Sequence, residues 1–130
     1  MWYEYLSKTV YLHKLYKIIP SLNDVQITKI SINDEGNRIT LAFVMPTYAD
    51  FPPAKWDGYN VAVVEVDFFG ISKLQLDTVA NTYRGDISIE KNEYGLLEIT
   101  VEGSLSLSII ADAGLIQRVD ACLIRDEDER

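Results

Sequence analysis

Few side chains in this sequence could carry out nucleophilic or metal chemistry. The chain has one histidine, His13, and one cysteine, Cys122. A catalytic nucleophile needs a base beside it, and that base needs a third group to hold it in place. His13 lies among apolar neighbours in a predicted helix, so we interpret it as a structural or surface helix residue. Cys122 lies in an apolar strand, so we interpret it as an inert, structural thiol. Because a structural zinc site takes four ligands, mostly from these two residue types, we expect no metal site.

Pairs of carboxylates are the remaining candidates for catalysis. Glu65 and Asp67 are two residues apart in one predicted strand, and Glu98 and Glu102 flank Thr100 in another. Such pairs could provide the acid and the base of a glycosidase-like reaction. The same spacing is typical of the solvated face of a sheet, which is the interpretation we favour. The seven glycines are scattered and form no phosphate-binding loop, so we predict no catalytic residue and no cofactor.

The charge of the chain bears on the kind of partner it can have. Twenty acidic and 12 basic residues give a net charge of −8. Such a chain lacks the basic surface that nucleic acids require, and no stretch reaches the roughly 20 apolar residues of a membrane span. We therefore expect neither nucleic acid nor membrane as partner. Charge alone favours ordinary solubility as the reason for the acidic surface, which also suits association with a protein that has a basic surface. The lone cysteine and the N-terminus, which does not resemble a secretory signal, predict a cytoplasmic location.

The hydrophobic pattern predicts a mostly β member of the α+β class. A helix is expected from Ser7, its N-cap, to Ile19, where Pro20 ends it. Alternating residues then predict about seven strands in an antiparallel sheet, a half-open barrel or a sandwich. The strands are expected at residues 25–32, 39–45, 61–69, 86–91, 97–101, 105–109 and 116–124, with turns at residues 33–37, 92–95 and 112–114. The segment around Leu74 and Leu76 is ambiguous.

The predicted elements imply how the chain is packed and divided. The N-terminal residues Trp2, Leu6, Leu12 and Leu15 are expected to pack on a sheet face made by Leu41, Phe43, Val64, Val66, Ile99, Val101 and Leu107, because each apolar surface needs a partner. Residues 1–125 are expected to form a single β-rich domain. Residues 126–130 are expected to form an acidic C-terminal tail.

Residues 46–59 are predicted to form a long loop that binds a partner. Three of the four prolines lie here, which excludes a central strand and stiffens the segment. Aromatic anchors on a rigid frame lose little entropy on binding. The candidate contact residues are Tyr48, Asp50, Phe51, Trp56, Asp57 and Tyr59. Alternatively, Trp56 and Phe51 fold back to cap the core.

The order of these features resembles the Immunity protein 50 family over nearly the whole chain. The matching features are Leu15-Tyr16, Pro20-Ser21-Leu22, the loop Pro46…Pro52-Pro53-Ala54-Lys55-Trp56 with the apolar strand after it, and Gly85-Asp86-Ile87. The resemblance implies a predicted immunity protein of a bacterial polymorphic-toxin system. Such a protein is not an enzyme and neutralises a cognate toxin by binding it. The family pattern supplies no contact residues.

Two other classes of function stay open from the sequence. A small-ligand-binding β domain or an enzyme would use a carboxylate-lined sheet face, and would show a deep pocket along Glu65 and Asp67. A structural or oligomerisation module, for instance a homodimer, would show an exposed apolar patch repeated across a two-fold axis.

Overall fold

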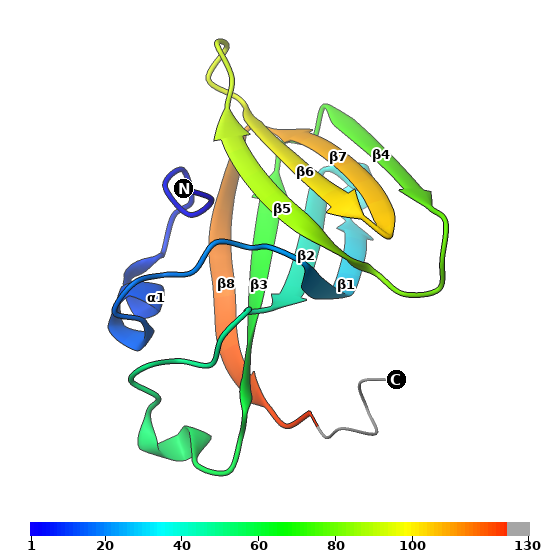
Figure 1. Cartoon of the computed structure of the whole chain (residues 1–130). Helices are drawn as coiled ribbons and strands as arrows, with labels where there is room; N and C mark the ends of the chain where they lie inside the picture. The colour runs from blue at the N-terminus through cyan, green and yellow to red at the C-terminus, as the bar shows by residue number, and fades with distance from the viewer. Residues whose placement is uncertain (125–130) are drawn as a thin grey trace.

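The computed structural model describes residues 1–124 and shows one antiparallel sheet with a short helix beside it (Figure 1). The elements are α1 (Val10–Leu15), β1 (Val25–Asn33), η1 (Asp34–Gly36), β2 (Arg38–Val44), η2 (Ala54–Trp56), β3 (Val61–Phe69), β4 (Lys73–Thr78), β5 (Arg84–Lys91), β6 (Leu97–Gly103), β7 (Leu105–Ala111) and β8 (Ala113–Cys122). The predicted mostly β class is confirmed. The ambiguous segment forms an eighth strand, β4. The predicted acidic tail, residues 126–130, lies outside the described residues.

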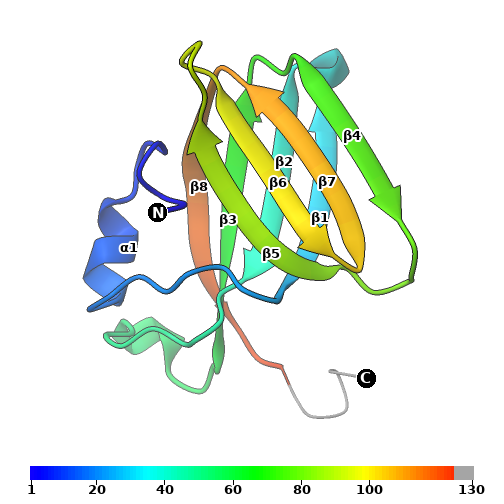
Figure 2. The same cartoon turned by 45° about the horizontal axis from the view of Figure 1, so that its top comes forward.

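The sheet folds over on itself and is not closed into a barrel. Its strand order is β4-β7-β6-β5-β1-β2-β3-β8. One half, β5, β6, β7 and β4, lies across the other half, β1, β2, β3 and β8 (Figure 2). The predicted alternation is confirmed in both halves: Val64 and Val66 of β3 and Leu107 and Ile109 of β7 are buried. The apolar faces of the two halves therefore enclose the core.

The two halves are joined through a very short strand pairing. β1 and β5 pair only at Val25 with Gly85 and at Gln26 with Arg84. A Cβ on Gly85 would lie 2.7 Å from the carbonyl oxygen of Glu102. A Cβ on Gly103 would overlap the carbonyl oxygen of Arg84. β5 and β6 can approach each other this closely, next to the pairing with β1, only because both positions are glycine.

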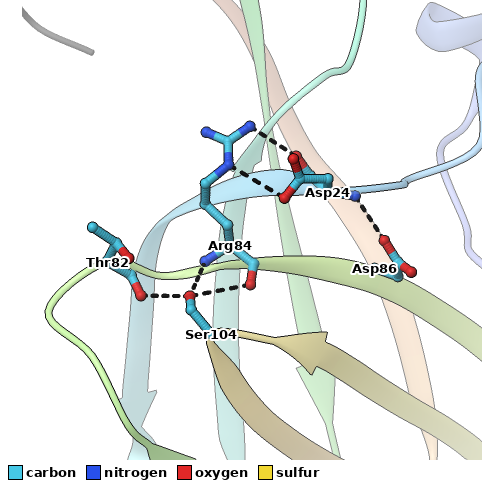
Figure 3. A network of polar contacts seen from close by, with 5 residues as sticks. All are labelled: Asp24, Thr82, Arg84, Asp86 and Ser104. Atoms are coloured by element: carbon cyan, nitrogen blue, oxygen red, sulfur yellow. Dashed lines mark hydrogen bonds and ion pairs between the residues drawn. The ribbon is translucent and has the colours of Figure 1, made fainter. Parts of the chain in front are cut away.

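A network of polar contacts surrounds this junction (Figure 3). The Arg84 guanidinium donates to the carbonyl oxygen of Asp24 at 2.8 Å, and the Asp24 backbone N–H donates to the carboxylate of Asp86 at 2.7 Å. The Ser104 hydroxyl accepts from the Arg84 backbone N–H at 2.9 Å and donates to the carbonyl oxygen of Thr82 at 2.6 Å. Three separate segments are thus tied together where the sheet folds over.

The N-terminal helix is shorter than the sequence predicts. The expected bounds, Ser7 to Ile19, are wrong, because α1 covers only Val10–Leu15. Ser7 does not cap the helix, because its backbone is paired with β8. Its N–H donates to the carbonyl oxygen of Gly114 and its carbonyl accepts from the N–H of Ile116, both at 3.0 Å. A long-range strand contact therefore replaces the expected first turn.

The N-terminal segment covers the side of the fold between β8 and β5. Beyond α1 it reaches β5, where the Leu22 carbonyl accepts from the N–H of Ile87 at 2.9 Å. The Trp2 indole N–H donates to the carbonyl oxygen of Pro20 at 3.0 Å, and its ring centroid lies 5.7 Å from that of Phe43. The predicted packing is confirmed: one buried cluster holds the N-terminal residues Trp2, Leu6, Leu12 and Leu15 and the sheet residues Leu41, Phe43, Val64, Val66, Ile99, Val101 and Leu107.

The last strand also begins earlier than predicted. The expected turn at residues 112–114 is reduced to Asp112, and β8 spans Ala113–Cys122. β7 and β8 are not neighbours in the sheet, so no hairpin turn is needed between them. The chain instead passes from one half of the sheet to the other at Asp112, whose N–H donates to the carbonyl oxygen of Phe69 at 2.9 Å.

Replacing Gly103 by Ala should lower the free energy of unfolding by about 3 kcal/mol, because the new methyl group meets backbone that cannot move aside. Gly95→Ala is the matched control: its φ is +78° but nothing lies within 4 Å, so about 1 kcal/mol of backbone strain is expected. Urea unfolding followed by circular dichroism measures both. Equal losses of stability in the two variants would contradict the close approach of β5 and β6 at Gly103.

Candidate functional site

The predicted binding loop is fixed to the N-terminal segment. The backbone N–H of Phe51 donates to the carbonyl oxygen of Leu15 at 3.0 Å. The backbone N–H of Lys17 donates to the carboxylate of Asp50 at 2.9 Å. The loop and α1 lie side by side at one end of the molecule in both views (Figures 1 and 2). These contacts give the loop a defined position although only η2 within it is regular.

The aromatic side chains of the loop divide into two groups. Trp56 is 4% exposed, and its ring packs edge-on against Tyr11 and tilted against Tyr48. Tyr48 is half-buried and its hydroxyl donates to the carbonyl oxygen of Trp56 at 3.1 Å. Phe51 is 60% exposed and Tyr59 is 47% exposed. The structure therefore turns Trp56 inward and leaves Phe51 and Tyr59 facing solvent.

The charges at this end of the molecule are mixed. Asp50 and Asp57, both among the predicted contact residues, are exposed. Lys14 of α1, Lys17 after it and Lys55 of η2 are exposed as well. The excess of negative charge is therefore located elsewhere on the surface.

Tyr16, a buried residue just after α1, forms a hydrogen bond with the start of the loop. Its side chain is 3% exposed and its hydroxyl donates to the carbonyl oxygen of Thr47 at 2.7 Å. Burial, and secondarily the negative charge of Asp50 and the neighbouring Tyr48, raise the pKa of the Tyr16 phenol well above its usual value. Tyr16 thus remains a neutral hydrogen-bond donor wherever the protein is folded at ordinary pH.

The predicted carboxylate pair on β3 is engaged in contacts within the sheet. Glu65 forms ion pairs with Lys29 of β1 at 3.7 Å and with Arg118 of β8 at 3.4 Å. Asp67 is buried and accepts a hydrogen bond from the Thr40 hydroxyl at 2.7 Å. Both residues lie on the face of β3 that points away from the core. They are held by cross-strand partners, as expected for the outer face of a sheet.

A second set of carboxylates is placed together by the β5–β6 register. Glu90 lies directly opposite Glu98, and Asp86 lies directly opposite Glu102. All four side chains are exposed, and none of them forms an ion pair with another described residue. Between the two pairs, Ser88 faces Thr100. We call Asp86, Glu90, Glu98 and Glu102 the acidic sheet face; they alternate along β5 and β6 with buried residues such as Ile87 and Ile99, so their side chains point away from the core.

Of these four residues, only Glu98 and Glu102 were considered from the sequence, as a pair along one strand. It was missed that each lies opposite an acidic residue of the neighbouring strand. The hairpin turn at residues 92–95 was predicted, and with it the register could have been set. Glu90 and Glu98 would then have emerged as opposed residues, because their positions sum to the same value as the other pairs of this hairpin.

A large cleft is lined by none of the carboxylates of either set. It has a volume of about 860 Å³ and is formed by the start of β1, the end of β2 and the segment before β5, with Val25, Met45 and Tyr83 among its lining residues. Neither Glu65 nor Asp67 lines it, so the pocket expected of a carboxylate-based enzyme is not found there. Within residues 1–124, no three acidic, histidine or cysteine side chains gather as a metal site would require, and no helix has the length and apolar character to cross a membrane.

The arrangement is that of a β protein with two distinct surfaces, one aromatic and one acidic. The chain belongs to the Immunity protein 50 family, whose sequence model matches residues 8–121. No curated protein and no solved structure matches the chain.

Replacing Tyr16 by Phe should lower the free energy of unfolding by about 1–2 kcal/mol near neutral pH, because the Thr47 carbonyl loses its donor. In the unfolded chain the phenol releases its proton above about pH 10, whereas in the folded chain the raised pKa retains it. The stabilisation by Tyr16 is therefore present below pH 10 and is lost as the pH rises further. Urea unfolding of both proteins from pH 7 to 11 should show their difference shrinking above pH 10; a constant difference would contradict the account.

Proposed function

We propose that this protein is the immunity protein of a bacterial polymorphic-toxin system and neutralises its cognate toxin by forming a complex with it. Family membership supports the class of function. We further infer that its role is non-enzymatic and that it acts in the cytoplasm, where a toxin reaching or produced in the cell would have to be blocked. Charge and exposed aromatic rings are the features of the molecule suited to this task.

The acidic sheet face is the observation that carries the proposal. Like charges placed directly opposite each other on a sheet destabilise it, by roughly 0.2–1 kcal/mol for each pair. Here two such pairs, Glu90 with Glu98 and Asp86 with Glu102, lie on one face of the sheet, and none of the four carboxylates forms an ion pair with a described residue. A basic surface laid on this face would remove the repulsion. The free protein thus presents a surface whose electrostatic strain a basic toxin would relieve.

The loop end supplies a different kind of contact. Phe51 and Tyr59 are exposed rings on a backbone that is already held in place, so little ordering would be needed on binding. Asp50 and Asp57 lie beside them and can pair with basic groups at the rim of an interface. Tyr48 and Trp56 support the loop by packing. We propose that Phe51 and Tyr59 anchor the toxin while the acidic sheet face speeds the encounter.

The double substitution Glu90→Gln/Glu98→Gln should slow association with the toxin at least tenfold at low salt, and by much less at high salt. It should also leave the fold as stable as before or up to about 1 kcal/mol more stable, because the repulsion is removed. Stopped-flow binding at two salt concentrations and urea unfolding measure the two effects. Weaker binding together with greater stability separates a binding role from a structural one.

The control for this experiment removes the same charge elsewhere. Asp34→Asn/Glu35→Gln changes two exposed acids in η1, at the β1–β2 turn. Its association rate should change less than that of the sheet-face variant. Equal effects of the two variants would show that only net charge matters, and would contradict the acidic sheet face as the binding surface.

Replacing Phe51 by Ala should raise the dissociation rate of the toxin complex about 30-fold, the effect of losing roughly 2 kcal/mol at an anchor residue. The stability of the free protein should hardly change, because the ring is exposed and the backbone bond to Leu15 remains. Tyr48→Ala is the matched comparison and should instead lower stability, since its ring packs on Trp56. Surface plasmon resonance measures the dissociation rate. An unaltered dissociation rate in Phe51→Ala would show that Phe51 is not an anchor residue of the interface.

A further inference from the structure

β4 leaves one edge of the sheet without a partner. It pairs with β7 on one side, and all six of its residues are exposed. No other described segment pairs with its second side. The opposite edge of the sheet, β8, differs in that Ser7 forms an isolated bridge with its residue Leu115. An unpaired edge strand presents free backbone donors and acceptors and is a template for pairing with another chain.

Two residues of β4, Leu74 and Leu76, direct their backbone hydrogen-bonding groups at this open edge. Val79, just beyond the strand, donates its N–H across to the carbonyl oxygen of Ser104 before β7. Because hydrogen-bonding groups alternate along a strand, the N–H and C=O groups of Leu74 and Leu76 point away from β7. Their side chains lie opposite the buried Ile109 and Leu107, on the face toward the core. They nevertheless remain 38% and 42% exposed.

We propose that β4 pairs with β4 of a second copy of this chain, antiparallel and about a two-fold axis at Gln75. In this register Lys73 of each copy lies opposite Asp77 of the other, so two ion pairs of opposite charge form across the axis. Leu74 lies opposite Leu76 of the other copy, with the backbone groups of both directed at the partner. The strand is thus self-complementary in charge, in apolar contact and in hydrogen bonding.

Other registers of this pairing do not satisfy both the backbone hydrogen bonds and the charges of β4. A shift by one residue places the outward backbone groups of Leu74 and Leu76 opposite groups that are bonded to β7. A shift by two residues places Lys73 opposite Gln75 or Val79 and leaves the charges unpaired. Because this pairing uses the β4 edge of both copies, that edge is no longer open in the dimer. The assembly therefore stops at two copies rather than growing into a fibre.

The test is the mass of the full chain in solution without toxin, measured by sedimentation equilibrium. A small interface gives a weak dimer, so the measurement is made at a high concentration of about 100 µM. At this concentration the mean mass of the native chain should approach that of two copies. Lys73→Asp and Asp77→Lys should each weaken dimerisation at least tenfold, since each places like charges opposite each other. The double variant Lys73→Asp/Asp77→Lys restores opposite charges and should dimerise again.

The control is Lys55→Asp, a charge reversal at the far end of the molecule, which should leave the dimer unchanged. Circular dichroism verifies that each variant is folded. A monomeric native chain, single variants that dimerise as the native chain does, or a double variant that stays monomeric would each overturn the proposal. Because no toxin is present, failure here leaves the proposed immunity function untouched, and failure of toxin binding leaves this result untouched.

Discussion

The short junction between β1 and β5 is the constraint on which the rest of the structure depends. Two residue pairs join the halves of an eight-stranded sheet, and at this point the sheet turns back across itself. Beside this junction, Gly85 and Gly103 permit the close approach of β5 and β6, because a side chain at either position would meet backbone atoms. Once the halves are folded over, their apolar faces enclose one core and their polar faces point outward. The acidic sheet face is a direct consequence of this arrangement.

The N-terminal segment completes what the folded sheet leaves open. It bonds to β8 through Ser7 and to β5 through Leu22, and it places Trp2 against Phe43 in the core. The same segment then supports the loop through Leu15, Tyr16 and Lys17. The exposed aromatic rings of the loop are thus positioned by a segment whose own place is set by the sheet. On the opposite side nothing described covers β4, which accounts for its exposed leucines.

Local pattern predicted the strands well and long-range contacts poorly. β3 and β7 were recognisable because their alternation reflects one buried face. Ser7 was misinterpreted as a helix cap because the sequence does not reveal that its backbone forms hydrogen bonds with β8. β4 was ambiguous because its leucines are half-solvated and lie at an open edge.

In the candidate site too, local sequence features were predictable and long-range contacts were not. The loop could be recognised from its prolines and aromatic residues, but which rings pack inward depends on Tyr11, a residue of α1 far away in the sequence. The opposed carboxylates of β5 and β6 depend on register, which alternation along one strand cannot give. Net charge predicted an acidic surface, and only the folded sheet shows where that charge is concentrated.

The central claim is that this member of the Immunity protein 50 family acts by binding a toxin through surfaces that the folded sheet positions. The most direct measurement is the mass, by light scattering, of a mixture of this protein with its cognate toxin. The account predicts a stable complex containing equal numbers of the two chains. Two separate species at micromolar concentrations of both proteins would contradict it.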